Sequence, residues 1–359
     1  MSIPTYNLYN FVAQALENKF LIKNFYPWGE KEFQNIIDHS TDPIQGDTYQ
    51  DITDRSNPNI KDLRYRKIPV LICHDQEPLD FDLYNDINML EQLDNIPQRK
   101  DIEYFLNKGH KDLNLRWIHA EHEAEHWTLL HSEINSAEVD KYNATGLFRC
   151  AYWWAHAPIA IDWFRFAHYD NRLQRQSQDI NANFLVYARG TTGKRAYRNS
   201  FIEQLKSIDS VQLGSINKQT VSSQTSAEYN PMDFAYTNCS IVLETVFDRI
   251  HLTEKTLRPL ACGHPFLILN GPGALETIRS YGFRTFEPYI NESYDKEQDS
   301  NKRMHMVLKE MQRINSLSTV EQTNLWKECN LIADYNKQLF FNDRFLANVK
   351  AELQRNVLV

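Results

Sequence analysis

The chain has 359 residues, which is enough for two domains of ordinary size that each bury a core of their own. Its net charge of −8 at pH 7 argues against a protein that coats nucleic acid with its whole surface, although a local basic groove is compatible with that charge. Five cysteines without a C-x-x-C pair, no apolar run of membrane-spanning length and no signal pattern together predict a soluble, cytoplasmic protein with reduced thiols.

The first half of the chain carries the pattern of a parallel α/β domain. Apolar residues recur at helical spacing within Tyr6–Phe20, and Lys67–Cys73 is a continuous apolar run typical of a buried strand. The polar residues His74, Asp75 and Glu77 follow this strand, at the end where open α/β sheets bind ligands. A carboxylate at this position suits either a catalytic base or a cap on the next helix.

The segment His122–His126 has the sequence His-Glu-Ala-Glu-His. Its spacing satisfies the pattern in which two histidines one helical turn apart bind zinc and the glutamate activates water. That pattern needs a helix, whereas Trp127–Leu130 has the character of a strand, and no clear spacing for a third ligand follows. A solvated, charged helix end is therefore favoured over a zinc site, and we expect no bound metal.

A second polar loop follows the strand Trp127–Leu130 and resembles the loop after Cys73 in its polarity. This position makes His131 and Glu133 candidates for the acceptor side of a site, together with His74, and a cap on the next helix is the alternative. The aromatic segment that comes next is predicted to be helical after Pro158 and to pack between domains or line an acceptor groove.

The polar run 170–181 is the predicted domain boundary, after which Phe184–Tyr187 opens the second domain as a strand. A basic loop with two glycines follows and leads into a helix that continues through Leu205. The N–H groups of a helix start and nearby cations suit a pyrophosphate, so Arg189 and Arg195 are candidates for binding it. The alternative is a solvated basic helix.

The stretch Ser240–Asn270 places two apolar strand-like runs around a polar loop and a short helix. Thr253 is predicted to cap this helix and Gly263 to end it. The cations in the loop would bind a nucleotide diphosphate, and the carboxylates would accept hydrogen bonds from ribose or sugar hydroxyls. The donor-binding candidates in this stretch are Glu244, Arg249, His251, Thr253, Glu254 and Lys255.

The run from Glu244 to Lys255, which ends in Thr-Glu-Lys and precedes a Gly-His-Pro-Phe strand start, resembles the donor-site motif of fucosyltransferase-type and exostosin-like glycosyltransferases. It is still more similar to a group of glycosyltransferases encoded by tailed bacteriophages, and the resemblance extends over roughly Asn183–Asp295. It implies an α/β fold of the GT-B type, with two Rossmann-like domains that face each other across a cleft. It also implies that His251, Glu254 and Lys255 contact the donor.

Fucosyltransferase-like enzymes have a Glu-x-Pro-like segment after a strand similar to Lys67–Cys73, with the Glu as the candidate base. The resemblance therefore favours Glu77 as the catalytic residue ahead of Asp75. The predicted domains are residues 1–175 on the acceptor side, 182–330 for the nucleotide sugar, and a C-terminal helix in 331–359 that crosses back to the first domain.

We therefore predict a glycosyltransferase that moves a hexose or pentose from a nucleotide-diphosphate sugar to a hydroxyl acceptor by an inverting, metal-independent reaction. No cofactor is expected beyond the donor itself. The phage likeness adds a hydroxymethylated base in DNA, modified in the host cytoplasm, to glycan, protein and lipid-carrier acceptors. A zinc-dependent hydrolase and a non-catalytic nucleotide-sugar or glycan-binding protein are the alternatives, and the sequence leaves the oligomeric state open.

Overall fold

The computed structural model describes residues 5–17, 19–25, 36–38, 70–74, 78–81, 127–144, 148–174, 180–214 and 226–358. The chain divides into two compact units. The N-terminal unit consists of Pro4–Ala155 together with Lys350–Val359, and the C-terminal unit is His156–Val349.

The N-terminal unit is built on a five-stranded sheet in the order β2–β1–β3–β4–β6. Strand β2 is antiparallel to β1, and the other neighbours are parallel. The predicted apolar strand is β3, which lies between β1 and β4 and whose residues Leu71, Ile72 and Cys73 are buried. The elements are α1 Thr5–Ala15, β1 Leu21–Phe25, β2 Ile36–Asp38, β3 Val70–His74, β4 Trp127–His131, β5 Glu133–Ile134, α8 Ala137–Ala144 and β6 Phe148–Tyr152.

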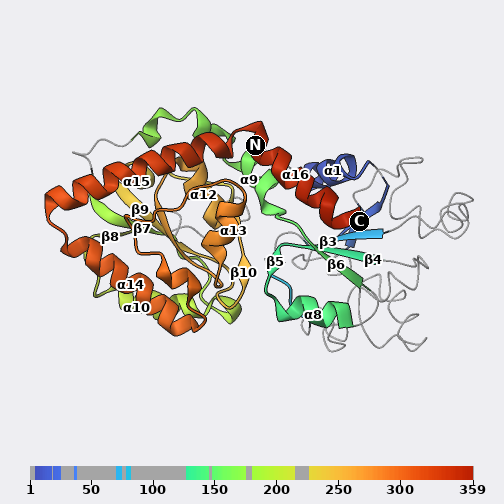
Figure 1. Cartoon of the computed structure of the whole chain (residues 1–359), viewed down its shortest axis with the longest axis horizontal. Helices are drawn as coiled ribbons and strands as arrows, with labels where there is room; N and C mark the ends of the chain where they lie inside the picture. Colours follow the sequence, from blue (N-terminus) through green and yellow to red (C-terminus); the bar gives the residue numbers. More distant parts are fainter. Residues whose placement is uncertain are drawn as a thin grey trace, which may run out of the picture. The chain divides into compact units, whose positions relative to one another are not determined.

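The C-terminal unit contains a four-stranded parallel sheet in the order β11–β9–β7–β8. Figure 1 shows α12 and α15 on one side of this sheet and α10 and α14 on the other. The elements are α9 His156–Trp163, η2 Arg165–His168, η3 Asn171–Leu173, β7 Ala182–Val186, η5 Gly193–Arg195, α10 Tyr197–Leu205, β8 Val211–Leu213, α11 Pro231–Ala235, β9 Thr237–Leu243, β10 Ile250–His251, α12 Glu254–Cys262, β11 Phe266–Leu269, α13 Ala274–Ser280, η8 Ser293–Lys296, α14 Ser300–Ser316 and α15 Thr319–Phe340.

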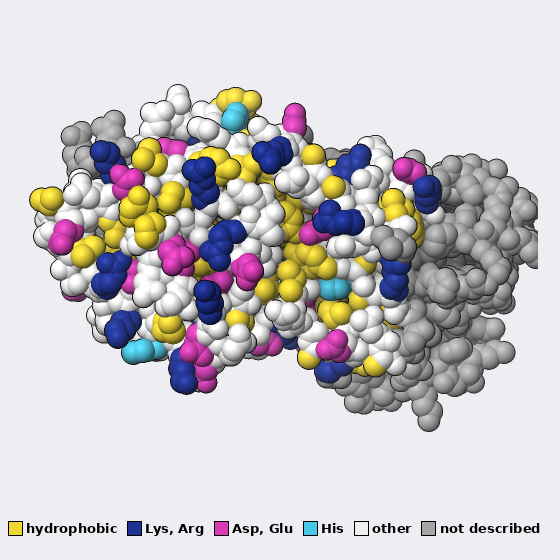
Figure 2. Space-filling model, viewed as in Figure 1, with side chains coloured by type: hydrophobic (Ala, Val, Ile, Leu, Met, Phe, Trp, Pro, Cys, Tyr) yellow, Lys and Arg dark blue, Asp and Glu magenta, His cyan; other side chains and the backbone are white. Residues whose placement is uncertain are grey.

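The chain is therefore an α/β protein with two largely parallel sheets, and the α/β class predicted from the sequence is confirmed. Figure 2 shows Lys and Arg side chains interspersed with Asp and Glu on the visible face of the C-terminal unit, so the charges on this face are of mixed sign. Among the helices that the structure describes, none combines the length and the apolar character of a membrane span.

Local signals at helix ends are confirmed in α12 and α15. Thr253 caps α12, its side chain accepting a hydrogen bond from the N–H of Lys255, and Gly263 ends the helix with φ at 64°. Ser318 and Glu321, a Ser-x-x-Glu pair in the sequence, form a capping box at the start of α15.

The division between the units falls at His156, ahead of the polar run 170–181 that the sequence suggests as a boundary. Polarity marks that run, yet α9 packs on α12 and η3 packs on α11, so the residues on its N-terminal side already belong to the C-terminal unit. At the other end, helix α16 (Asp343–Val357) finishes in the N-terminal unit. There Arg149 donates to the carbonyls of Asn356 and Val357 at 2.8 and 2.9 Å.

Candidate functional site

The strand order of the C-terminal sheet creates a topological switch point between β7 and β9. The chain runs from β7 outward to β8, then returns past β7 to form β9 and continues to β11. In open parallel sheets of this kind, the crevice outside the carboxyl ends of the strands at such a point is where ligands bind. The candidate site therefore comprises the loop after β7 (residues 187–196), the loop after β9 (residues 244–249) and the start of α12.

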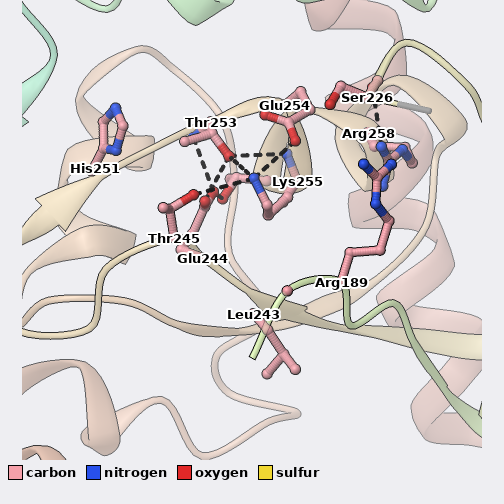
Figure 3. Close-up of polar contacts among 12 residues, drawn as sticks. Arg189, Ser226, Leu243, Glu244, Thr245, His251, Thr253, Glu254, Lys255 and Arg258 are labelled. Atoms are coloured by element: carbon pink, nitrogen blue, oxygen red, sulfur yellow. Dashed lines mark hydrogen bonds and ion pairs between the residues drawn. The ribbon is translucent and has the colours of Figure 1, made fainter. Parts of the chain in front are cut away.

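Glu244 lies at the end of β9 and is fully buried. Its Oε1 accepts hydrogen bonds from the N–H of Thr253 at 2.9 Å and from Oγ1 of Thr256 at 2.6 Å, while Oε2 accepts from Oγ1 of Thr253 at 2.6 Å. Figure 3 shows this carboxylate directed at the first turn of α12. Glu244 therefore orients the helix start, and its predicted contact with a ribose or sugar hydroxyl stays a prediction.

Lys255 lies in the first turn of α12 and its side chain is 25% exposed. The ammonium group donates to Oε1 of Glu254 at 2.8 Å, to Oγ1 of Thr253 at 3.1 Å and to Oγ1 of Thr245 at 3.3 Å. These contacts place a cation at the start of the helix, where the macrodipole also favours an anion. The predicted Thr-Glu-Lys segment thus forms one hydrogen-bonded group (Figure 3).

Glu254 is the first helical residue of α12, and it is buried. Burial by itself would raise its pKa, but the positive charges of Lys255, His156 and Arg258 outweigh burial and lower the pKa to about 2. The group is therefore an ionised acceptor at neutral pH, suited to binding the hydroxyls of a ribose or a sugar.

Arg258 is a residue of this region that sequence reasoning missed. It is 5% exposed and lies one helical turn after Glu254, with its guanidinium carbon 5.6 Å from the ring centre of Phe164 and 5.4 Å from that of Tyr187. Its Nη2 donates to the carbonyl of Ser226 at 3.1 Å. An arginine in a helix usually reaches solvent, so its apolar neighbours in α12 were the available signal for burial.

Arg189 and Arg195 both belong to the loop after β7, as predicted. Gly190 and Gly193 have φ values of 62° and 57°, a conformation that glycine adopts without strain, and Arg195 closes the short helix η5. A methyl group added at Gly190 would lie 3.2 Å from Cδ of Arg195, so this arginine folds back across the loop. Figure 3 shows the side chain of Arg189 extending from the same loop toward α12.

Arg249 directly precedes the short strand β10, His251 is the last residue of that strand, and both are buried. Arg249 forms an ion pair at 2.9 Å with Asp248, whose side chain is exposed. The ring of His251 packs edge-on against that of His156 with the centroids 5.3 Å apart. The amide of Asn270 bonds both the N–H and the carbonyl of His251, at 3.2 and 3.3 Å, and so fixes β10.

The acceptor-side candidates lie in the N-terminal unit, where His74 and His131 are neighbours in register at the ends of β3 and β4. Burial lowers the pKa of His131 to about 4, against a smaller opposing effect of the hydrogen bond with Glu133. Nδ1 of His131 accepts from the N–H of Glu133 at 3.3 Å, which leaves the proton of the neutral ring on Nε2.

The carboxylate of Glu133 holds neighbouring segments in place. It accepts hydrogen bonds from the N–H of Leu79 at 2.7 Å and from Oγ of Ser136, and is buried. Glu133 thus ties Leu79 to Ser136, the residue directly before α8, and its predicted place on the acceptor side stays a prediction. Asp75 and Glu77 lie outside the described residues, as does the segment His122–His126.

Within the part of the chain that the structure describes, no group of three or more His, Cys, Asp and Glu side chains could hold a metal ion. No family model, curated protein or solved structure matches the chain.

Proposed function

We propose that the chain is a glycosyltransferase of the GT-B type, which transfers a sugar from a nucleotide-diphosphate donor to a hydroxyl acceptor. The observation that carries the proposal is the start of α12, where Thr253, Glu254 and Lys255 form one hydrogen-bonded group held by Glu244 next to the β7/β9 switch point.

Each part of this group suits one part of a nucleotide sugar. The positive end of the α12 dipole and Lys255 attract a diphosphate, and Arg189 and Arg195 come from the neighbouring strand end. The ionised Glu254 accepts hydrogen bonds from the hydroxyls of the ribose or of the sugar. A diphosphate that leaves with negative charge needs such cations, and in this proposal Lys255, Arg189 and Arg195 supply them in place of a metal.

The other half of the reaction requires a base that removes the acceptor proton. Glu77, with Asp75 as the reserve, is the proposed base. His131 is a poor candidate because its protonated nitrogen is Nε2, and Glu133 because its carboxylate accepts hydrogen bonds from Leu79 and Ser136. The proposed acceptor is a hydroxymethylated base in DNA, and glycan, protein and lipid-carrier hydroxyls are the competing acceptors.

A two-step experiment tests the proposal. A panel of nucleotide sugars is first screened for thermal stabilisation, because a ligand at 100 times its Kd stabilises the folded state by about 2.7 kcal/mol. The best donor is then incubated with ordinary DNA, with DNA that contains hydroxymethylated cytosine or uracil, and with glycan acceptors, with and without a chelator. Transfer is read by the mass of the product.

The expected result is stabilisation by one nucleotide sugar and transfer that survives the chelator. Donor binding without turnover on any acceptor would favour a non-catalytic nucleotide-sugar-binding protein. Failure of every nucleotide sugar to stabilise the chain would contradict the proposal as a whole.

A further inference from the structure

Arg198, in the first turn of α10, is 1% exposed although it carries a full positive charge. Its Nη1 donates to the carbonyls of Arg189 and Gly190, and its Nη2 donates to those of Leu243 and Glu244 at 2.8 and 2.7 Å. The first two carbonyls belong to the loop after β7, and the other two lie at the end of β9. One planar guanidinium group therefore joins the two strand ends that border the switch point.

Burying the Arg198 guanidinium group in the core costs free energy. A buried cation loses its hydration, and carbonyl dipoles compensate a charge less fully than a carboxylate does. An apolar side chain of similar volume would fill the same space without that cost. The guanidinium group has five N–H donors fixed in one plane. It can therefore hold the main-chain groups that it binds at a defined distance from one another, which an apolar side chain cannot do.

Neighbouring side chains support the same loop. The hydroxyl of Tyr197 also donates to the carbonyl of Glu244, and its ring stacks on Phe247 with the centroids 4.7 Å apart. On the far side of Phe247, Arg303 from α14 donates to its carbonyl and lies 4.4 Å above its ring. The loop after β9 is thus held through its main chain at Leu243, Glu244 and Phe247.

Both strand ends lead directly to proposed ligand-binding groups. On one side, the main chain that Arg198 binds is that of Arg189 itself. On the other side, the side chain of Glu244 holds Thr253, whose Oγ1 in turn accepts a hydrogen bond from Lys255. Arg198 is therefore one of the groups that set the spacing between the cation of the β7 loop and the cation of α12, and it bonds the main chain of both strand ends.

We propose that Arg198 is a positioning residue, which sets the spacing of Arg189 and Lys255 around a bound diphosphate without touching it. The inference rests on the proposed function, because it assumes that a diphosphate is bound at the switch point. It adds a residue that acts only through the main chain of the two loops.

The experiment measures the affinity of the full-length chain for two probes by calorimetry: inorganic pyrophosphate and the nucleoside diphosphate that stabilises the chain most. Arg198→Lys keeps the charge but cannot reach four carbonyls at once, so we expect Kd for both probes to rise by about ten-fold or more. Asn336→Ala is the matched control, since buried Asn336 bonds the main chain of Arg284, away from the site.

A double-mutant comparison separates positioning from general loss of structure. If Arg198 acts partly through Arg189, the effect of Arg198→Lys on Kd should shrink when Arg189 is already alanine. Tyr197→Phe is the milder second variant for the case that Arg198→Lys does not fold. It removes one hydrogen bond to the carbonyl of Glu244 and should raise Kd by about two- to five-fold.

The outcomes are distinguishable. Parent-like affinity in a folded Arg198→Lys chain overturns the role of Arg198 and leaves the proposed function standing. If Arg198→Lys does not fold, parent-like affinity in Tyr197→Phe has the same two consequences. An equal loss of affinity in Asn336→Ala, or strict additivity with Arg189→Ala, also overturns it. Failure of the parent chain to bind either probe overturns the proposed function and this inference together.

Discussion

The carboxylate of Glu244 binds Thr253 twice, accepting from its N–H at 2.9 Å and from its hydroxyl at 2.6 Å. The contact ties the end of strand β9 to the first residue before helix α12, and a third hydrogen bond from Thr256 completes it at 2.6 Å. The position of the Thr-Glu-Lys segment relative to the sheet therefore depends on a buried carboxylate rather than on a flexible loop.

Replacing Glu244 with Gln should lower the free energy of unfolding by about 1 to 3 kcal/mol, because an amide NH₂ would then face one of the donors that the carboxylate now accepts. Urea unfolding followed by circular dichroism measures the change. Glu276→Gln, an exposed carboxylate of α13, is the control and should leave stability as it is. A Glu244→Gln chain as stable as the parent would show that these hydrogen bonds contribute little.

Replacing Lys255 with Ala should weaken binding of the nucleotide-sugar donor by about 1.5 to 3 kcal/mol, the range for a hydrogen bond to a charged group. The fold should survive, since the Lys255 side chain is partly exposed at the start of α12. Calorimetry gives the affinity, with Lys309→Ala on the exposed face of α14 as the control. Unchanged affinity in the folded Lys255 variant would remove this lysine from the site.

The stability of the N-terminal unit should depend on pH through His131. Burial lowers the pKa of its imidazole from 6.5 to about 4, so between these values the unfolded chain binds more protons than the folded one. The contribution of His131 to stability is therefore complete above pH 6.5 and is lost as pH falls toward 4, by about 3 kcal/mol in total.

The variant His131→Asn tests this dependence, because its amide oxygen can still accept from the N–H of Glu133. Unfolding by urea between pH 4 and pH 7 should show a flatter profile for this variant than for the parent. The exposed His305→Asn exchange is the control and should keep the slope of the parent. Parallel profiles for all three proteins would mean that His131 titrates normally.

Replacing Glu77 with Gln should leave donor binding intact and lower the rate of transfer by roughly 100-fold or more, the scale of general base catalysis. Single-turnover rates with saturating donor measure the effect, and Asp75→Asn serves as the parallel variant. A rate within a few-fold of the parent for Glu77→Gln would move the role of base to Asp75.

Changing His122 and His126 together to Gln should leave both transfer activity and metal content unchanged, because the sequence favours a solvated helix end over a zinc site. Metal analysis of the purified parent and of the double variant checks this. One zinc per chain in the parent, lost in the variant together with activity, would favour the hydrolase alternative.

The sequence by itself determined those features that depend on near neighbours. Thr253 and Gly263 indicate the two ends of α12, and the pair Ser318 and Glu321 indicates the start of α15. These signals are local because a cap bonds main-chain groups only two or three residues away. The continuous apolar runs that form β9 and β11 also predicted strands, since both faces of a parallel sheet are buried when helices cover them.

Only the tertiary structure decided which of these elements are neighbours and what their polar side chains bind. Strand β9 lies beside β7 rather than beside β8, and that order alone creates the switch point. Arg198 bonds carbonyls 45 and 46 residues further along the chain, and Glu133 bonds an N–H 54 residues before it. Periodicity and caps report a residue's own turn or strand, whereas partners at such separations are set by how strands order and helices pack, which no local pattern encodes.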